Sequence, residues 1–148
     1  KQWPANRWIA LIDALPADHE IHLLGGPVDR EACAHIQRTT HHPRVLNRAG
    51  ELSLLESAAL MQHARMNYAN DSAPVHLASA TDAPITAIFC STVPAFGFGP
   101  LSSRSRVAET EHALPCRPCG LHGYRACPEG HFRCADIPIE KVLATTAE

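Results

Sequence analysis

Apolar residues recur at helical spacing in five stretches of this 148-residue chain. In residues 5–15 they follow the pattern of an amphipathic helix, which Pro16 stops. Ser53 and Glu56 have the spacing of a capping box at the start of another helix. The pattern predicts helices over residues 5–15, 29–38, 54–65, 73–80 and 137–147.

Four short runs between these helices have the length and character of strands: residues 20–24, 44–47, 66–69 and 84–90. Strands and helices therefore alternate at intervals of roughly 20 residues, which is typical of βαβ units. Because each crossover then passes through a helix, we expect an α/β fold with a parallel sheet and helices on both faces.

Residues 66–80 combine a strand, a tight turn and a helix. Asn70, Asp71 and Ser72 are all residues that cap helices, and Pro74 fits only in the first turn of the helix. The unpaired N–H groups of such a turn and the helix dipole together favour a bound phosphate. An ordinary capped helix explains this stretch equally well.

Three turns follow predicted strands, at residues 25–29, 70–72 and 91–100. In open parallel sheets, ligands bind at the carboxyl ends of the strands. We therefore expect all three turns to lie on one edge of the domain and to form the binding site.

The composition is that of one globular domain. Hydrophobic residues make up 45% and charged residues 19%, which excludes a disordered chain. No apolar run reaches the length of a membrane span, and the net charge of −2 argues against sequence-independent binding to nucleic acid. The chain starts Lys-Gln-Trp-Pro and runs directly into a helix, with no preceding strand, so we expect it to be a fragment of a longer protein.

Four of the six cysteines fall within 19 residues, as Cys116, Cys119, Cys127 and Cys134. Their spacing suits a tetrahedral zinc site, either with four thiolates or with a histidine, such as His122 or His131, in place of one of them. Two disulfides or four free thiols are the alternatives.

The remaining cysteines, Cys33 and Cys90, are most simply buried thiols. A redox protein that uses Cys116 and Cys119 is disfavoured, because these residues follow a loop. They do not stand at the strand-to-helix start that lowers a thiol pKa in thioredoxin-like sites.

Four motifs occur in order along the chain. They are Lys1-x-Trp3-Pro4, Leu-Gly-Gly-Pro-x-Asp at 24–29, Ala-Gly-x-Leu-Ser-Leu at 49–54 and Asn-Asp-Ser-Ala-Pro-x-His at 70–76. Together they resemble glycosyltransferase family 9, the ADP-heptose:lipopolysaccharide heptosyltransferases of Gram-negative bacteria. The resemblance covers essentially the whole chain.

The resemblance implies a GT-B architecture, in which two Rossmann-like domains face each other across a cleft. This chain resembles only the C-terminal half. Residues 1–148 would then form the Rossmann-like domain that binds the nucleotide sugar, with a Cys-rich knuckle within 116–134, and the N-terminal acceptor domain would be absent. The implied reaction is transfer of heptose from ADP-heptose to the lipopolysaccharide inner core, with inversion. The general base belongs to the missing domain, so we expect no catalytic residue in this fragment, which would bind nucleotide without catalysis.

Donor-binding roles follow from the resemblance, residue by residue. Asp71 would contact hydroxyl groups of the donor sugar; a plain helix cap is the alternative. Backbone amides at Ser72 and Ala73 would hold the diphosphate, although Pro74 departs from the family pattern and removes one donor. His76 would lie near the phosphates, or would be a packed helix histidine.

Three further residues complete the implied donor site. Lys1 would neutralise the diphosphate of the departing ADP. Asp29 would bind the ribose hydroxyls, or cap the second helix, or do both. Leu52 would lie against the adenine, although an apolar residue before a helix is more often part of a core.

The implied partners are the ADP-heptose donor and, through the missing domain, the lipopolysaccharide core acceptor. We expect no nucleic acid, no organic cofactor, and at most a peripheral association with the membrane. The family works at the cytoplasmic face of the inner membrane, where thiols stay reduced, and this favours a structural zinc over disulfides. The alternative function is a metal-stabilised, Rossmann-like binding module without transferase activity.

Overall fold

The computed structural model describes residues 2–144 of the chain, which divide into two compact units. The N-terminal unit is Pro4–Ser57, and the C-terminal unit comprises Gln2, Trp3 and the described residues from Ala58 onward. Each unit contains its own parallel sheet.

The N-terminal unit contains two helices and two short strands that alternate along the chain. Its elements are α1 (Ala5–Asp13), β1 (Ile21–Leu23), the 3-10 helix η1 (Pro27–Asp29), α2 (Arg30–Thr39) and β2 (Val45–Asn47). The strands run parallel, with Ile21 opposite Val45. Ile12 of α1, Ile36 of α2 and Val45 form one buried apolar cluster. The predicted apolar faces of both helices therefore cover this sheet.

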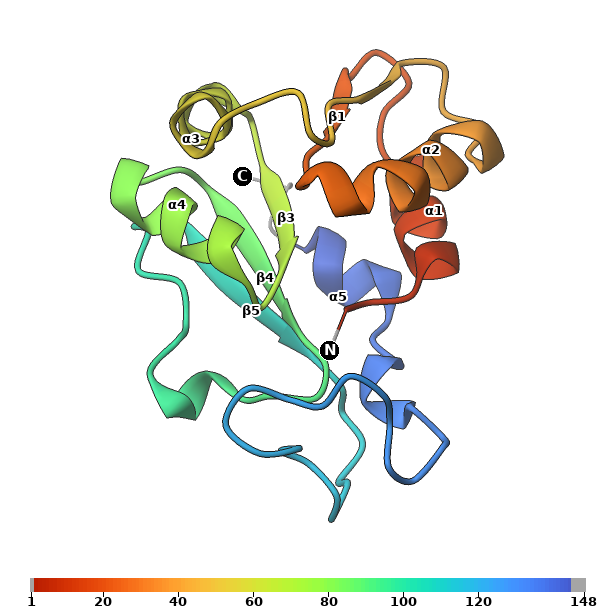
Figure 1. Ribbon diagram of the computed structural model, residues 1–148, viewed down its shortest axis with the longest axis vertical. Helices are drawn as coiled ribbons and strands as arrows, with labels where there is room; N and C mark the ends of the chain where they lie inside the picture. The colour runs from red at the N-terminus through yellow and green to blue at the C-terminus, as the bar shows by residue number, and fades with distance from the viewer. Residues whose placement is uncertain (1, 145–148) are drawn as a thin grey trace. The chain divides into compact units, whose positions relative to one another are not determined.

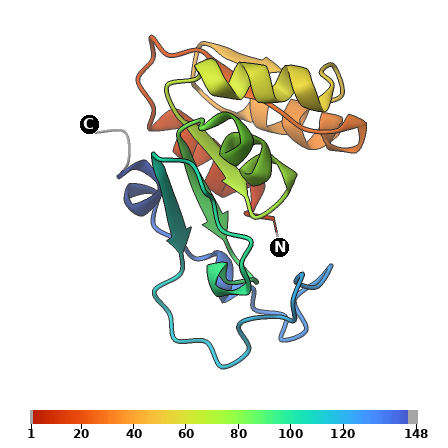
Figure 2. The same ribbon diagram turned by 90° about the vertical axis from the view of Figure 1, so that its left-hand side faces the viewer.

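The C-terminal unit is built on a three-stranded parallel sheet in the order β3-β4-β5. Its elements are the end of α3 (Leu54–His63), β3 (Asn67–Asn70), α4 (Ala73–Thr81), β4 (Ile85–Phe89), η2 (Pro94–Phe96), β5 (Ser105–Glu109), η3 (Arg133–Ala135) and α5 (Ile139–Leu143). All five residues of β4 are buried, as expected for the central strand. In Figures 1 and 2, α4 and α5 lie on opposite sides of this sheet, so the expected covering of both faces is confirmed in this unit.

Local signals predicted most elements to within a few residues. The capping box at α3 is present, because the Ser53 N–H donates to Glu56 Oε2 at 2.8 Å and the Glu56 N–H donates to Ser53 Oγ at 3.3 Å. Among the helices that the structure describes, α2 and α3 are the longest, with ten residues each. Within residues 2–144, no helix combines the length and apolar character that a membrane crossing requires.

Two sequence-based expectations about the strands were wrong. The strands form two sheets and not one, because the alternation of strands and helices predicts their direction but does not say which strands become neighbours. β5 was not predicted at all. Its sequence is Ser-Arg-Val-Ala-Glu and only Ala108 in it is buried, so this edge strand lacks the apolar run that identifies a buried strand.

Candidate functional site

The turn between β3 and α4 holds the carboxylate of Asp71 in a fixed position. Asp71 is only 5% exposed, and its backbone N–H donates to the carbonyl of Ile88 in β4 at 3.0 Å. The Thr92 hydroxyl, itself buried, donates to Asp71 Oδ2 at 2.5 Å. Ser72, and not Asp71, occupies the N-cap position of α4, so the plain helix-cap interpretation of Asp71 is wrong. The carboxylate is instead oriented by a hydroxyl from beyond the end of β4.

The first turn of α4 presents unpaired backbone donors at an exposed surface. Ser72 and Ala73 are exposed, and the Ser72 hydroxyl donates to the Asn70 carbonyl at 3.1 Å, so it makes no cap. Within residues 2–144, the N–H groups of Ser72 and Ala73 donate to no acceptor. Pro74 lies in the first turn as predicted and has no N–H to offer. Two donors and the helix dipole therefore make this turn suitable for an anion.

His76 lies exposed on α4, one turn after Ser72. The alternative that it is a packed helix histidine is therefore wrong, and its expected place near the phosphates stays a prediction.

The start of the described chain is attached to the end of β3. The Trp3 backbone N–H donates to Asn70 Oδ1 at 2.8 Å, and the buried Trp3 indole donates to the Ala135 carbonyl at 3.0 Å. Lys1, two positions earlier and expected to contact the diphosphate, lies outside the described residues. Its role stays a prediction.

Arg117 ties the Cys-rich segment, residues 116–134, to the end of β4. Its guanidinium donates to the carbonyls of Cys90 at 2.7 Å and Thr92 at 2.8 Å, and pairs with Glu109 of β5 at 2.6 Å. The Arg117 side chain is only 12% exposed. Because Thr92 in turn holds Asp71, Arg117 supports the carboxylate from a distance. Sequence reasoning missed both residues, since neither belongs to a recognisable motif.

The segment also contacts Ser91, which directly precedes Thr92. The Cys119 N–H donates to the Ser91 carbonyl at 2.8 Å. The Ser91 hydroxyl oxygen is buried and has no hydrogen-bond partner among residues 2–144. The end of β4 thus contains one hydroxyl that orients Asp71 and one that is available to a ligand or a water molecule.

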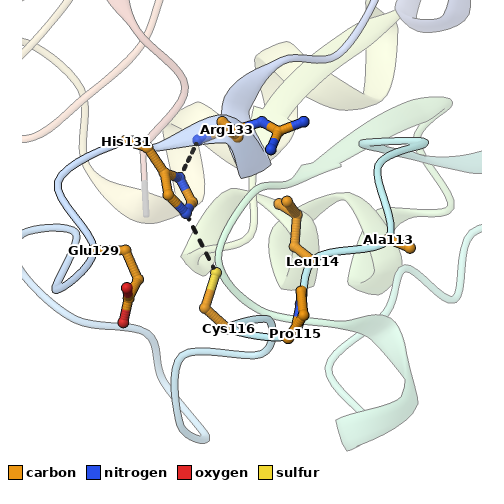
Figure 3. Close-up of a pocket in the computed structure, with 7 residues that line it drawn as sticks. All are labelled: Ala113, Leu114, Pro115, Cys116, Glu129, His131 and Arg133. Carbon is orange, nitrogen blue, oxygen red and sulfur yellow. Dashed lines mark hydrogen bonds between the residues drawn. The ribbon is translucent and has the colours of Figure 1, made fainter.

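The six cysteines are all free thiols. Cys116, Cys119 and Cys127 line one hollow of about 270 Å³, and Cys134 is buried. A neighbouring hollow of about 440 Å³, shown in Figure 3, includes Cys116 and His131, with 3.7 Å between Sγ and Nε2. Within residues 2–144, no three side chains of His, Cys, Asp or Glu are grouped as a metal site. The zinc site stays a prediction.

The thiols differ in their electrostatic surroundings. The backbone N–H of Phe132, which donates to Cys127 Sγ at 3.4 Å, lowers the pKa of the Cys127 thiol. Burial raises the pKa of the Cys119 and Cys134 thiols. Burial also raises the pKa of Cys90 to about 12, and the 0% exposure of this residue confirms it as a buried thiol. Cys33 is likewise buried, on α2.

The other predicted donor residues lie in the N-terminal unit. Asp29 occupies the N-cap position of α2, but its Oδ2 accepts the Gly26 N–H at 2.9 Å and makes no cap bond to that helix. A Cβ at Gly25 would lie 2.7 Å from Asp29 Cβ, so only glycine fits this turn. Leu52 is half-buried just before α3. Because these residues and Asp71 belong to different units, their expected position on one edge stays a prediction.

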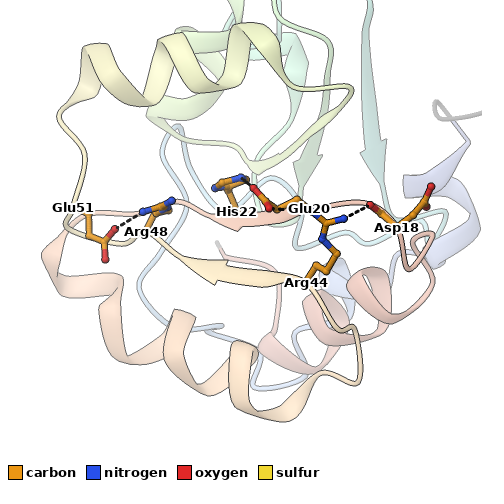
Figure 4. A network of polar contacts seen from close by, with 6 residues as sticks. All are labelled: Asp18, Glu20, His22, Arg44, Arg48 and Glu51. Atoms are coloured by element: carbon orange, nitrogen blue, oxygen red, sulfur yellow. Dashed lines mark hydrogen bonds and ion pairs between the residues drawn. The ribbon is translucent and has the colours of Figure 1, made fainter.

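Ion pairs lie along the surface of β1 and β2 (Figure 4). Glu20 accepts from His22 at 2.9 Å and from Arg44 at 3.4 Å, and Arg48 pairs with Glu51 at 3.3 Å. Pairs this exposed contribute little to stability. Because both arginines already have carboxylate partners, we assign them no role in binding an anionic ligand.

Comparison with known proteins gives a consistent result over most of the chain. The model of glycosyltransferase family 9 (heptosyltransferase) matches residues 1–123. Lipopolysaccharide heptosyltransferase 3 of Escherichia coli is 37% identical over 95 residues, which are 62% of this chain and 28% of that protein.

Two solved structures are also similar. The glycosyl transferase family 9 structure from Veillonella parvula matches with a TM-score of 0.66 and 28% identity, over 74% of this chain and 31% of that one. The ADP-heptose lps heptosyltransferase II of E. coli matches with a TM-score of 0.73 over 99% of this chain and 42% of that one, and at 24% identity it supports the fold alone. The chain spans less than half the length of each of these relatives. Because the family model covers most of its residues, the chain belongs to glycosyltransferase family 9.

Proposed function

We propose that this chain is the donor-binding part of an inverting glycosyltransferase that transfers heptose from ADP-heptose to the lipopolysaccharide inner core. The observation that supports this best is the β3–α4 turn, where a buried, oriented carboxylate stands next to unpaired backbone donors. The family match and the 37% identity to lipopolysaccharide heptosyltransferase 3 support a heptose donor and a lipopolysaccharide acceptor.

The two features of the turn suit the two parts of a nucleotide sugar. The N–H groups of Ser72 and Ala73 bind the diphosphate, with His76 beside it, because a helix N-terminus attracts negative charge. Asp71 would be repelled by phosphate, so its carboxylate accepts hydrogen bonds from sugar hydroxyl groups. Thr92 holds that carboxylate in place before the sugar arrives.

The remaining donor contacts come from the residues that the resemblance assigns. Asp29 binds the ribose, Leu52 contacts the adenine, and Lys1 offsets the charge of the departing ADP. Inversion also needs a general base on the acceptor side. That base belongs to an N-terminal domain outside this chain, so the chain alone binds nucleotide and does not catalyse. The complete enzyme acts at the cytoplasmic face of the inner membrane, where its lipopolysaccharide acceptor is built.

Titration calorimetry with ADP and with ADP-heptose tests this proposal. The chain should bind both. Asp71→Asn should weaken binding of ADP-heptose and leave binding of ADP nearly unchanged, because Asp71 contacts the sugar. Asp82→Asn, at the opposite end of α4, is the matched control. No heat at millimolar ADP, with the fold confirmed by circular dichroism, would contradict the site.

A metal-stabilised binding module without transferase activity is the second candidate. It is favoured by Cys127 and Cys134, which lie beyond the residues that the family model matches. Transfer assays on the full-length protein separate the two candidates. Asp71→Ala abolishes transfer under the first and changes nothing under the second.

A further inference from the structure

The Cys-rich segment has almost no apolar interior of its own. Among residues 111–133, all of which the structure describes, no residue is buried. Leu121 and Tyr124 are 52% and 57% exposed. The segment is nevertheless ordered against the end of β4 through Arg117 and Cys119. Hydrophobic burial therefore contributes little free energy to this segment, and a covalent or metal cross-link would add to the few hydrogen bonds that hold it.

The four cysteines stand where one cross-link could join the two ends of the segment. Cys116, Cys119 and Cys127 line the same hollow. A tight turn leads from Cys127 to Cys134: the Gly130 N–H donates to the Cys127 carbonyl at 3.1 Å, and the Phe132 N–H donates to Cys127 Sγ at 3.4 Å. The 3-10 helix η3 follows at once and contains Cys134. A backbone N–H directed at sulfur is the kind of contact that orients a thiolate ligand.

The ring orientation of His131 distinguishes a site of four thiolates from one in which the histidine replaces a thiolate. Its Nδ1 accepts the Arg133 N–H at 3.0 Å, so Nδ1 carries no proton and Nε2 carries it. Nε2 faces Cys116 Sγ at 3.7 Å, as Figure 3 shows. A protonated nitrogen cannot bind a metal but can donate to a sulfur ligand. His131 therefore supports Cys116 and does not replace a thiolate.

We propose that Cys116, Cys119, Cys127 and Cys134 bind one structural zinc ion as four thiolates, with His131 donating to the sulfur of Cys116. Zinc–sulfur bonds of about 2.3 Å require the 116–119 loop to close further on the 127–134 turn, since the described side chains are not yet grouped as a metal site. On binding, the thiols lose their protons and the ion joins both loops. The ion thereby keeps Arg117 on the carbonyls of β4.

Metal analysis of the whole chain, purified under reducing conditions and exposed to zinc, tests the proposal without any nucleotide. We expect about one zinc ion per chain by mass spectrometry of the metal content. Cys127→Ser should lose the zinc, and Cys33→Ala, which changes a buried thiol on α2, should keep it. Zinc that stays bound to the Cys127→Ser chain would overturn the ligand set. So would a zinc-free wild type with four reactive thiols, or one with two disulfides by intact mass.

Cobalt(II) substitution keeps the test decisive if Cys127→Ser fails to fold. The wild-type chain should show the intense sulfur-to-cobalt charge-transfer band of a tetrahedral thiolate site, whose intensity grows with each thiolate bound. His131→Ala should keep the intensity of the band, because all four thiolates remain, and should weaken zinc binding by about 10-fold through the lost hydrogen bond to sulfur. A wild-type band no more intense than three thiolates give would overturn the four-thiolate set.

Discussion

The turns before α4 and before α2 share a sequence pattern but are stabilised in different ways. Each places an acidic residue shortly after a parallel strand. Asp71 is buried and accepts from Thr92, 21 residues away in the sequence. Asp29 is half-buried and accepts from Gly26, three residues earlier. The Asp71 carboxylate is therefore held by a residue that follows the neighbouring strand β4, whereas the Asp29 carboxylate is held within its own turn.

This difference shows that the α4 turn depends on the rest of its unit. The orientation of Asp71 requires Thr92, and the carbonyl of Thr92 is held by Arg117. The Asp29 bond closes within a single turn and needs no such support. Substitutions far from the α4 turn in sequence should therefore disturb the position of Asp71. The position of Asp29 should change only with substitutions in its own turn.

Among the variants that test this difference, Arg117→Met should lower the free energy of unfolding most. It leaves the Glu109 carboxylate and the carbonyls of Cys90 and Thr92 without their cationic partner. Breaking a buried ion pair costs about 3–5 kcal/mol, and we expect about 2–3 kcal/mol because Glu109 is 36% exposed. Urea denaturation measures this loss in the free energy of unfolding.

Arg38→Met is the matched control for Arg117→Met. Arg38 pairs with Glu31 on the surface of α2, and both side chains are largely exposed. Its removal should change stability by less than about 0.5 kcal/mol. Equal losses for the two variants would show that the Arg117 contacts stabilise the fold no more than an exposed ion pair does.

Thr92→Val should have the next largest effect. The valine has nearly the shape of threonine but leaves a buried carboxylate without its hydroxyl donor, which costs about 1–3 kcal/mol. Thr92→Ser keeps the hydroxyl and should lose less stability than Thr92→Val. Thermal denaturation of both variants shows which of them unfolds at the lower temperature. If serine proved as destabilising as valine, lost packing would explain the effect better than the lost hydrogen bond.

Asp29→Ala should have the smallest effect on stability. Its bond to the Gly26 N–H is exposed and local, so its loss should cost no more than about 1 kcal/mol. Asp29→Asn keeps an acceptor and should lie closer to the wild type in a urea titration. A loss as large as that of Thr92→Val would mean that the α2 turn also relies on distant contacts.

Sequence-based prediction succeeded for features that depend on contacts between residues only a few positions apart. The capping box of Ser53 and Glu56 and the place of Pro74 in the first turn of α4 are both confirmed. β5 escaped prediction because an edge strand needs only one buried residue, and such a strand has no periodic signature. The hydroxyl that orients the Asp71 carboxylate comes from Thr92, which no local pattern connects to it.

The sequence by itself determined the alternation of helices and strands, the caps and turns, and the spacing of the four thiols. Each of these is set by bonds between residues a few positions apart. Only the tertiary structure decided which strands pair, which hydroxyl orients Asp71 and where the Arg117 guanidinium lies. These features depend on groups that are distant in sequence and meet only after the chain has folded.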